Sequence, residues 1–411
     1  MTAVEFWDKR SVENIISSLI CQPDKVILVG EGKKTQVFAQ RYRAFLAQRG
    51  QNTRVETRSI RRNSLRDIVA VLSDIVETEE RCIFDLTGGE DLALVAMGIV
   101  FQLYPEKKIQ MQRCNVPSGV ITDCDGDGQI LYCGKPKLSV EELIAIHGGQ
   151  VRHSSDTRKA TPTWDITPEF TADVDTLWQL CRADPALWNS HVRILAAMEH
   201  LCQGQQEILL EKQLLRKTLR QARIREVDMT PFLKELYRRG LIHTYWETDQ
   251  QLSLQFKNSQ IRQCLLTAGL VLELKIYLTA LELQDREGRF ICTDARNGVV
   301  IDWDAQLQPQ EGSDTENEID VIVMQGMLPL FISCKNGFID TEELYKLDAV
   351  TTRFGGAYAK KALVCTYFGK QGSSVDYFRR RARDMHIHLV ENVHEMTDGE
   401  LRKALRRCLG S

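Results

Sequence analysis

The residues best suited to chemistry lie after residue 265, where acids and a lysine are spaced so that they can converge. Glu273 falls within a predicted helix over Gly269–Tyr277 and shares a largely apolar face with Ile276 and Ala280. A carboxylate on such a face needs a partner, such as a metal ion or another cation. Glu273 is therefore a candidate metal ligand.

Two predicted strands carry the other groups of this constellation. Glu318 and Asp320 begin one strand, and Ser333 and Lys335 end the next, after a turn at Gly326. Alternate residues of a strand share a face, so each pair projects from one side of the hairpin. Acids on one strand, a lysine on the other and an acid on a nearby helix form the layout of a metal-dependent phosphodiesterase. The carboxylates would hold Mg²⁺ or Mn²⁺, the metal would generate the nucleophilic hydroxide, and the lysine would position or activate the water.

The first 150 residues alternate strand and helix signals, which predicts a doubly wound parallel sheet. Strands over 25–29, 52–57, 81–86 and 108–114 alternate with helices over 33–49, 65–76 and 91–103. In such sheets ligands bind at the carboxyl ends of the strands, where two glycine-containing loops fall here. The candidate ligand-binding residues of these loops are Gly30, Glu31, Gly32, Lys33, Lys34, Thr35, Thr87, Gly88, Gly89 and Glu90. Neither loop is a Walker A or GxGxxG motif, and ordinary tight turns remain the alternative.

Other segments carry weaker signals. Residues 123–128 match half of a calcium loop, but predicted strands flank them, which favours a β-hairpin turn. Residues 154–173 are predicted to be a linker, and helices are predicted over 173–201, 208–224 and 229–239. Two strands over 240–246 and 251–256 then suggest a winged-helix-like module. Basic runs over 212–225 and 353–383 could contact a phosphate backbone or be solvated surface.

Composition narrows the functional classes further. The chain has 411 residues, with 53 basic and 56 acidic side chains and a net charge of −3, which excludes a globally basic nucleic-acid binder. Its 12 cysteines form no CxxC pair, so reduced thiols in a cytoplasm are expected rather than a disulfide scaffold or zinc module. No apolar run approaches the length of a membrane span, and the N-terminus lacks a signal-peptide core. We expect no membrane partner.

At this point the motifs support a resemblance. Asp320 followed by Ser333-Cys334-Lys335 looks like the PD-(D/E)XK nuclease motif, and Glu273 matches the acid that this superfamily often has on its first helix. The stretches NEIDVIV, LFISCKNG and ELYKLDAVTTRFGG are similar to the nuclease half of the CRISPR-associated Rossmann-fold (CARF) effectors of the type III ancillary group. Asp85-Leu-Thr87-Gly88-Gly89 resembles the TGG loop of CARF domains. Both signatures stand in the order of the family, whose architecture spans essentially the whole chain.

The resemblance implies a homodimer whose paired CARF domains bind one cyclic oligoadenylate, most often cyclic tetra-adenylate. It also implies that the backbone carbonyl of Cys334 is aimed at the metal. Two positions depart from the family pattern. Ser333 stands where many members have Glu, so Glu318 or Glu273 would have to substitute and Ser333 would contact a metal-bound water. Glu90 stands where many CARF loops continue with Thr-Lys, and Lys33 and Lys34 could compensate.

The prediction is an α/β protein of three parts: a Rossmann-like CARF domain over 1–155, a linker and winged-helix-like module over 156–260, and a restriction-endonuclease-like domain over 261–411. It would be a cytoplasmic, metal-dependent endonuclease that cleaves DNA or RNA in type III CRISPR antiviral defence. The main alternative is a ligand-sensing, nucleic-acid-binding regulator with an inactive nuclease domain. A third hypothesis is that the CARF domain degrades its own ligand, with Thr35 and Thr87 as the available hydroxyls.

Overall fold

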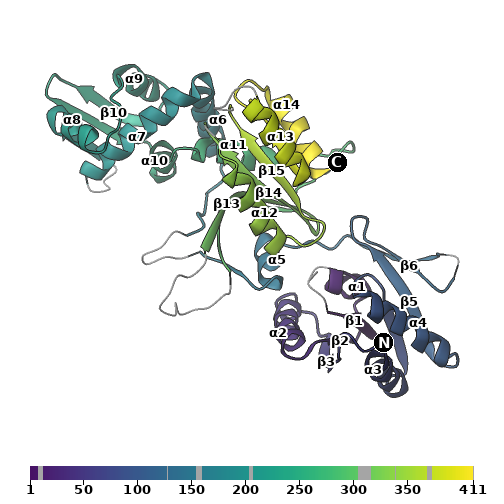
Figure 1. Ribbon diagram of the computed structural model, residues 1–411. Coiled ribbons are helices and arrows are strands. Elements are labelled where there is room, and N and C mark those ends of the chain that lie inside the picture. The colour runs from purple at the N-terminus through teal and green to yellow at the C-terminus, as the bar shows by residue number, and fades with distance from the viewer. Residues whose placement is uncertain are drawn as a thin grey trace.

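Three β-sheets organise the part of the chain that the computed structural model describes, residues 1–7, 13–126, 128–153, 160–202, 207–303, 316–337, 339–367 and 373–410. Within these residues the sheets have seven, three and six strands. Figure 1 shows them along an elongated molecule, with the seven-stranded sheet at one end, the three-stranded sheet at the other and the six-stranded sheet between them. Helices alternate with the strands, so the predicted α/β class is confirmed.

The first sheet has the strand order β3-β2-β1-β4-β5-β6-β7 and is parallel from β3 to β5. Its elements are β1 (Thr2–Phe6), α1 (Glu13–Cys21), β2 (Lys25–Gly30), α2 (Gly32–Gln48), β3 (Arg54–Ser59), α3 (Leu65–Thr78), β4 (Arg81–Asp85), α4 (Asp91–Leu103), β5 (Lys108–Asn115), β6 (Val120–Asp123) and β7 (Ile130–Cys133). Helices α3 and α4 pack on one face, and α1 and α2 on the other. This is the doubly wound arrangement predicted from the alternating signals.

The central strand β1 was missed by the sequence analysis. It pairs with β2 on one side and β4 on the other, and all five of its residues are buried. Glu5 breaks its apolar pattern, yet the structure buries this carboxyl and satisfies one oxygen with the Ser18 hydroxyl at 2.8 Å. Burial raises the pKa of Glu5 well above its usual range. A buried acid in a five-residue segment hides the strand from a pattern search.

The segment over 123–128 connects the antiparallel strands β6 and β7, as predicted, although Asp127 lies outside the described residues. The backbone N–H of Asp125 donates to the Asp123 carboxylate at 3.2 Å, which is the local bonding of an Asx turn. The hairpin interpretation is therefore confirmed.

The middle of the chain forms a helical module around the three-stranded antiparallel sheet β10-β11-β9. Its elements are α6 (Pro168–Ala183), α7 (Pro185–Leu201), β9 (Glu207–Glu211), α8 (Lys212–Gln221), α9 (Thr230–Arg238), β10 (Ile242–Glu247), β11 (Gln251–Phe256) and α10 (Ser259–Leu266). The order helix, strand, two helices and two strands from α7 to β11 is winged-helix-like, as expected.

Three boundaries in this module differ from the prediction. Helix α6 begins at Pro168, within the expected linker, because the Thr167 hydroxyl accepts the N–H of Phe170 and proline suits the first helical turn. A second helix starts at Pro185, where Asp184 caps it, so the expected single helix is two. The segment from 208 begins as strand β9, in which buried and exposed residues alternate with a period of two.

The six-stranded sheet has the order β16-β15-β14-β13-β12-β8. Its elements are α5 (Val140–Ile146), β8 (Gln150–Val151), α11 (Leu270–Leu281), β12 (Asp294–Asp302), β13 (Glu316–Gln325), β14 (Leu328–Lys335), α12 (Glu342–Phe354), β15 (Lys360–Cys365), α13 (Ser373–Asp384), β16 (Ile387–Val390) and α14 (Asp398–Leu409). Apolar residues of α11 and α14 pack on one face, and those of α12 and α13 on the other.

The chain reaches this sheet before the middle module begins. Strand β8 pairs with β12, and the first N–H of α5, at Val140, donates to the carboxylate of Asp294 at 2.8 Å. Figure 1 shows α5 between the six-stranded sheet and α2 of the first sheet. Helix α5 is therefore the physical joint between the two sheets. Among the described helices, none combines the length and the apolar character that crossing a bilayer requires.

Candidate active site

The hairpin β13–β14 places Asp320 against the Ser333–Cys334 segment. Asp320 Oδ2 accepts the backbone N–H of Cys334 at 2.6 Å and the Ser333 hydroxyl at 3.2 Å. Ser333 is buried and lies behind the carboxylate, which it helps to orient. The two predicted strands therefore bring their functional side chains together across the hairpin.

A glycine with positive φ stands opposite Asp320 on the neighbouring strand β12. The register pairs Asn297 with Val321 and Val299 with Ile319, which sets Gly298 opposite Asp320. Gly298 has a φ of +61°, a conformation that L side chains rarely adopt, and a Cβ there would lie 3.0 Å from Pro162 Cδ. The position opposite the catalytic candidate therefore favours glycine over any residue with a side chain.

Asn297 connects the helix and the hairpin and was not predicted. Its side-chain amide donates to the Asp320 carbonyl at 3.0 Å and to Glu273 Oε2 at 3.4 Å. The indole N–H of Trp164 donates to Asn297 Oδ1 at 3.0 Å, which fixes the orientation of the amide. The signal in the sequence was a polar Asn-Gly step inside an otherwise apolar strand, which the analysis left unused.

The charges at the site oppose one another. Burial raises the pKa of Asp320, while the charge of Lys335 and the N–H of Cys334 act in the opposite direction. Burial alone would lower the pKa of Lys335, but Asp320 and an ion pair with Glu343 at 2.7 Å raise it above its ordinary value. Lys335 is therefore a cation at neutral pH. Glu343, at the start of α12, is a second residue that the sequence analysis missed.

These side chains surround a pocket of about 510 Å³ between the six-stranded sheet and the middle module. Five predicted site residues line it: Glu273, Glu318, Asp320, Cys334 and Lys335. The opposite wall comes from the middle module, through Asn189 and Arg193 of α7 and Gln263 and Thr267 at α10. The sequence analysis assigned no role to that wall.

The donor set of the pocket suits a hard cation. Carboxylate and carbonyl oxygens are the ligands that Mg²⁺ and Mn²⁺ prefer, and Glu273, Glu318, Asp320 and Cys334 offer these. The side chains line one cavity, but the described residues contain no group of three possible ligands within reach of a single ion. The chemistry of these residues fits a divalent metal. Their side chains would have to move closer together to bind one ion.

The first candidate ligand loop lies where the carboxyl end of β2 meets α2. Residues Glu31 to Lys34 are exposed, and the buried Thr35 hydroxyl donates to the Glu31 carbonyl at 3.2 Å. A Cβ at Gly30 would lie 2.5 Å from that hydroxyl, so only glycine allows the helix to begin so close to the strand. Lys33 and Lys34 thus stand at the first turn of α2 with their side chains available to an anion.

The second loop, over 87–90, is held by hydrogen bonds to Asp85, the last residue of β4. This buried carboxylate accepts the Thr87 backbone N–H at 2.9 Å and the Thr87 hydroxyl at 2.5 Å, and the same hydroxyl accepts the N–H of Cys114 at 2.8 Å. Burial raises the pKa of Asp85. The hydroxyls of Thr35 and Thr87 are both engaged in internal hydrogen bonds, Thr35 with the Glu31 carbonyl and Thr87 with Asp85 and Cys114, which weakens the hypothesis that they attack a ligand. Gly89 adopts a φ of +105° and packs against Phe6.

Arg62 joins the two loops, and the sequence analysis did not identify it. Its Nε donates to Glu90 at 2.9 Å, and its guanidinium lies 3.9 Å from the Glu31 carboxylate. The acid that departs from the family pattern is thus neutralised by an arginine of the neighbouring loop. The cavity at this edge measures only about 20 Å³ in the single chain. A nucleotide-sized ligand would have to lie on the open surface or between two copies.

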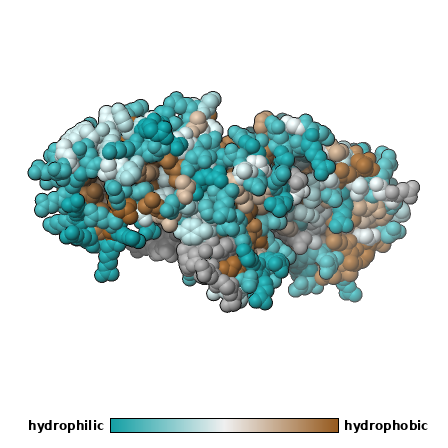
Figure 2. Space-filling view, turned by 90° about the horizontal axis from the view of Figure 1, so that it is seen from above, coloured by the Kyte–Doolittle hydropathy of each residue, from teal (hydrophilic) through white to brown (hydrophobic). Residues whose placement is uncertain are grey.

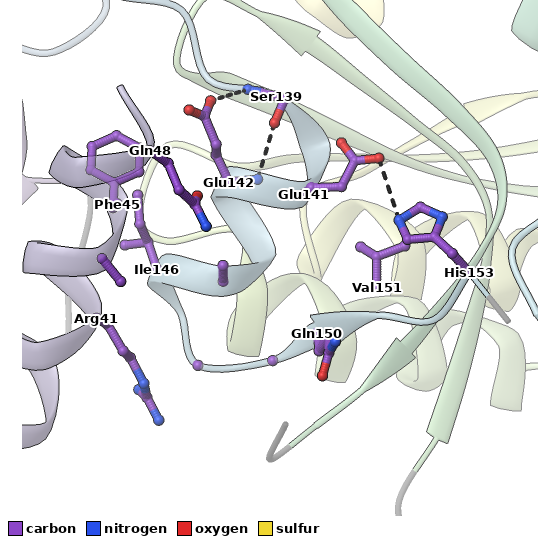
Figure 3. Close-up of a pocket in the computed structure, with 14 residues that line it drawn as sticks. Arg41, Phe45, Gln48, Ser139, Glu141, Glu142, Ile146, Gln150, Val151 and His153 are labelled. Carbon is purple, nitrogen blue, oxygen red and sulfur yellow. Dashed lines mark hydrogen bonds and ion pairs between the residues drawn. The ribbon is translucent and has the colours of Figure 1, made fainter. Parts of the chain in front are cut away.

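A further pocket, of about 700 Å³, lies at the joint between α2 and the segment over 139–153 (Figure 3). Phe45 and Gln48 of α2 face Glu142 and Ile146 of α5 across it. Nearby, Arg49 makes two hydrogen bonds of 2.8 Å to the Glu142 carboxylate. This ion pair joins the seven-stranded sheet, which carries the glycine loops, to helix α5, which packs on the six-stranded sheet.

The two basic runs differ in how many of their cations have hydrogen-bond or ion-pair partners within the chain. Of the seven cations that the structure describes in the C-terminal run over 353–383, five have partners: Arg353 with the carbonyl of His147, Lys360 with that of Leu409, Lys361 with Asp348, Arg379 with Glu391 and Arg381 with Tyr345. In the run over 212–225, Lys212 and Arg216 are paired with Glu247 and Glu226. Its other cations, Lys217, Arg220, Arg223 and Arg225, are exposed. The basic surface that remains is concentrated on the middle module.

Comparison with known proteins shows similarity of fold over the entire chain. A crystal structure of protein VC1899 from Vibrio cholerae aligns with a TM-score of 0.72 and 18% identity, covering 100% of this chain and 97% of that one. Can2 from Sulfobacillus thermosulfidooxidans, solved in complex with cyclic tetra-adenylate, aligns with a TM-score of 0.69 and 17% identity, covering 100% and 99%.

A third structure, a type III CRISPR defence DNA nuclease activated by cyclic oligoadenylate, aligns with a TM-score of 0.51 and 16% identity. That alignment covers 99% of this chain and 52% of the other. No protein-family model and no curated protein sequence matches the chain. The chain thus has the fold of the CARF-nuclease proteins of type III CRISPR systems, and the resemblance found in the sequence is confirmed at the level of the fold.

Proposed function

We propose that this chain is a divalent-metal-dependent endonuclease that cyclic oligoadenylate activates, with cyclic tetra-adenylate as the expected activator. The observation that carries the proposal is the pocket in which Asp320, Lys335 and Glu273 meet. Support comes from a fold shared over the full length with Can2, a protein that binds cyclic tetra-adenylate. The substrate would be DNA or RNA, and the biological setting would be type III CRISPR antiviral defence.

The residues of the chain suggest a division of labour in phosphodiester hydrolysis. A water oxygen would attack phosphorus, the bond to the leaving oxygen would break, and that oxygen would take a proton. Because its pKa is raised, Lys335 would act as a cation that orients the water and stabilises developing negative charge, not as the base. Asp320, held by Cys334 and Ser333, would present its remaining lone pairs to the pocket.

A bound Mg²⁺ or Mn²⁺ would supply an activated water and neutralise charge on the phosphate. Asp320, Glu273, the Cys334 carbonyl and Glu318 are the residues that we expect to hold it. Ser333 lacks a carboxylate, and the structure uses its hydroxyl to orient Asp320. The acid expected at this position would therefore have to come from Glu273 or Glu318.

The sensing half would act as a homodimer. Helix α4 exposes several large apolar side chains, including Leu92, Val95 and Leu103, and Figure 2 shows hydrophobic residues gathered at the end of the molecule that holds the seven-stranded sheet. An apolar surface of this kind is typical of an interface between copies. The activator would lie across that interface, against the loops over 30–35 and 87–90. The three-part division at residues 155 and 260 belongs to the same proposal, except that α5 and β8 pack with the six-stranded sheet and α10 extends the middle module to Leu266.

Cleavage assays test the proposal directly. Labelled single-stranded DNA, single-stranded RNA and supercoiled plasmid would be incubated with Mn²⁺, with and without cyclic tetra-adenylate. We expect cutting that requires both metal and activator and that Asp320→Ala abolishes. Cutting that persists in the variant would refute the assignment of the site.

A regulator without nuclease activity is the second candidate. It is favoured by the serine at 333 and by the lack, among the described residues, of three ligands gathered for one metal. Lys335 opposes it, because an inactive site has no need of a half-buried cation on that hairpin. Binding of cyclic tetra-adenylate and nucleic acid without cleavage of any substrate, in either metal, would support the regulator.

A further inference from the structure

The middle module supplies one wall of the pocket that holds Asp320 and Lys335. Asn189 and Arg193 stand one turn apart on α7, so they share a face of the helix, and both line the pocket. The wall is thus built by a segment that is more than a hundred residues away in sequence from the nuclease-like hairpin.

Asn189 ties this wall to the hairpin. Its Nδ2 donates to the Asn336 carbonyl at 2.5 Å, and Asn336 Nδ2 donates back to Asn189 Oδ1 at 2.9 Å. Asn336 directly follows Lys335, so the reciprocal pair fixes α7 against the end of the strand that carries the lysine. These two hydrogen bonds of the side-chain amides constrain the orientation of α7 against the strand as well as its distance. The next turn of α7 is thereby held against the pocket.

Arg193 occupies that next turn. Its side chain is exposed, and it makes no salt bridge with any residue in the described part of the chain. The carboxylates of Glu273, Glu318 and Asp320 line the same cavity and would repel a phosphate. Lys335 is already paired with Glu343. Among the lining residues that the structure describes, Arg193 is therefore the cation without an ion-pair partner, and it comes from the middle module.

We propose that Arg193 binds a phosphate of the substrate strand, the phosphate adjacent to the one at which the strand is cut. The middle module would then complete the substrate site. The inference rests on the proposed nuclease function, and its substrate is a phosphodiester chain, not a mononucleotide. A guanidinium presents paired N–H donors to phosphate oxygens, which makes arginine well suited to this contact. Arg193 would determine how tightly the substrate is held, while the chemistry stays with the hairpin.

Binding and cleavage separate this proposal from the nuclease proposal. Fluorescence anisotropy of a labelled oligonucleotide would be measured with the full chain carrying Asp320→Asn, which cannot cut, in the presence of Mn²⁺ and cyclic tetra-adenylate. Arg193→Ala should weaken binding about tenfold and lower the slope of log K against log salt by about 0.7 for a single strand or 0.9 for a duplex. Arg193→Lys, which keeps the charge, should recover most of the affinity.

In the cleaving protein, Arg193→Ala should raise KM by a similar factor and change kcat less than threefold. Arg286→Ala is the matched control, because this exposed arginine does not line the pocket, and it should leave affinity, salt slope and KM unchanged. An unchanged affinity and salt slope in Arg193→Ala would overturn the inference even if the protein cuts normally. A wild type that binds through Arg193 but cuts nothing would instead count against the nuclease proposal alone.

Discussion

Replacing Asp320 with asparagine should separate the stability of the fold from its function. The carboxyl is largely enclosed, and burial raises its pKa above the ordinary value despite the charge of Lys335 and the N–H of Cys334. An asparagine keeps an oxygen that accepts the same hydrogen bonds and removes the buried charge. We expect Asp320→Asn to raise the free energy of unfolding of the metal-free protein by about 1 kcal/mol at neutral pH.

The direction of the pKa shift also fixes how this difference depends on pH. The folded protein binds the Asp320 proton more tightly than the unfolded chain does. The wild type therefore loses stability relative to the variant as the pH rises from the ordinary aspartate pKa, about 3.9, through the raised value of the folded state. The difference in the free energy of unfolding between the variant and the wild type should be smallest in acid. It should reach its full size above the pKa of Asp320 in the folded protein.

A divalent cation should reverse the order of stability. A ligand present at one hundred times its dissociation constant stabilises the state that binds it by about 2.7 kcal/mol. The wild type should gain this much in Mn²⁺ and the variant little, because the variant lacks the carboxylate that we expect to bind the metal.

Chemical denaturation at pH 5 and pH 8, with and without Mn²⁺, measures both effects on one scale. Asp249→Asn serves as the control, since Asp249 is an exposed acid outside the pocket and should change neither comparison. A metal-free Asp320→Asn protein that is less stable than the wild type, or one that Mn²⁺ stabilises equally, would refute the reasoning.

Two further substitutions test the supports of the site. Glu343→Gln removes the ion pair that helps to raise the pKa of Lys335. The alkaline limb of the cleavage pH profile should therefore move to lower pH. An unmoved limb would show that this lysine does not act as the required cation. Gly298→Ala would put a side chain at a φ of +61° and 3.0 Å from Pro162, so urea denaturation should show a loss of about 1–3 kcal/mol. Gly399→Ala, whose new Cβ meets nothing within 4 Å, should show no such loss.

Elements with a clear period were predictable from the sequence. Helix α3 runs over Leu65–Thr78, close to the predicted 65–76, because its buried residues Ile68, Leu72, Ile75 and Val76 recur at helical spacing. Strand β1 was missed because the buried Glu5 looks like a surface residue until Ser18, from another element, is seen to bond it. Strand β9 was read as helix because five residues hold too few repeats to separate a period of two from one of 3.6.

The residues of the candidate site also fall into two groups, those predictable from the nearby sequence and those brought to the site only by tertiary packing. Asp320 and Lys335 could be placed on one hairpin because strand alternation and a turn are local properties. Asn297, Glu343 and Arg193 could not, since each reaches the site from an element whose position depends on packing far along the chain. A motif search identifies groups that are close in sequence, whereas the residues that orient them and complete the pocket are close only in space.

The path between the two proposed functions is continuous in the structure. Helix α2 begins at the first glycine loop, and Arg49, directly after its last residue, binds Glu142 of α5. The first N–H of α5 donates to Asp294 on β12, and β12 pairs with β13, the strand that carries Asp320. Contiguity of this kind transmits control only if the activator binds one arrangement of these elements more tightly than another. The half-exposed Arg49–Glu142 pair and the pocket beside it make this joint, rather than either packed sheet, the place where two such arrangements would differ at least cost.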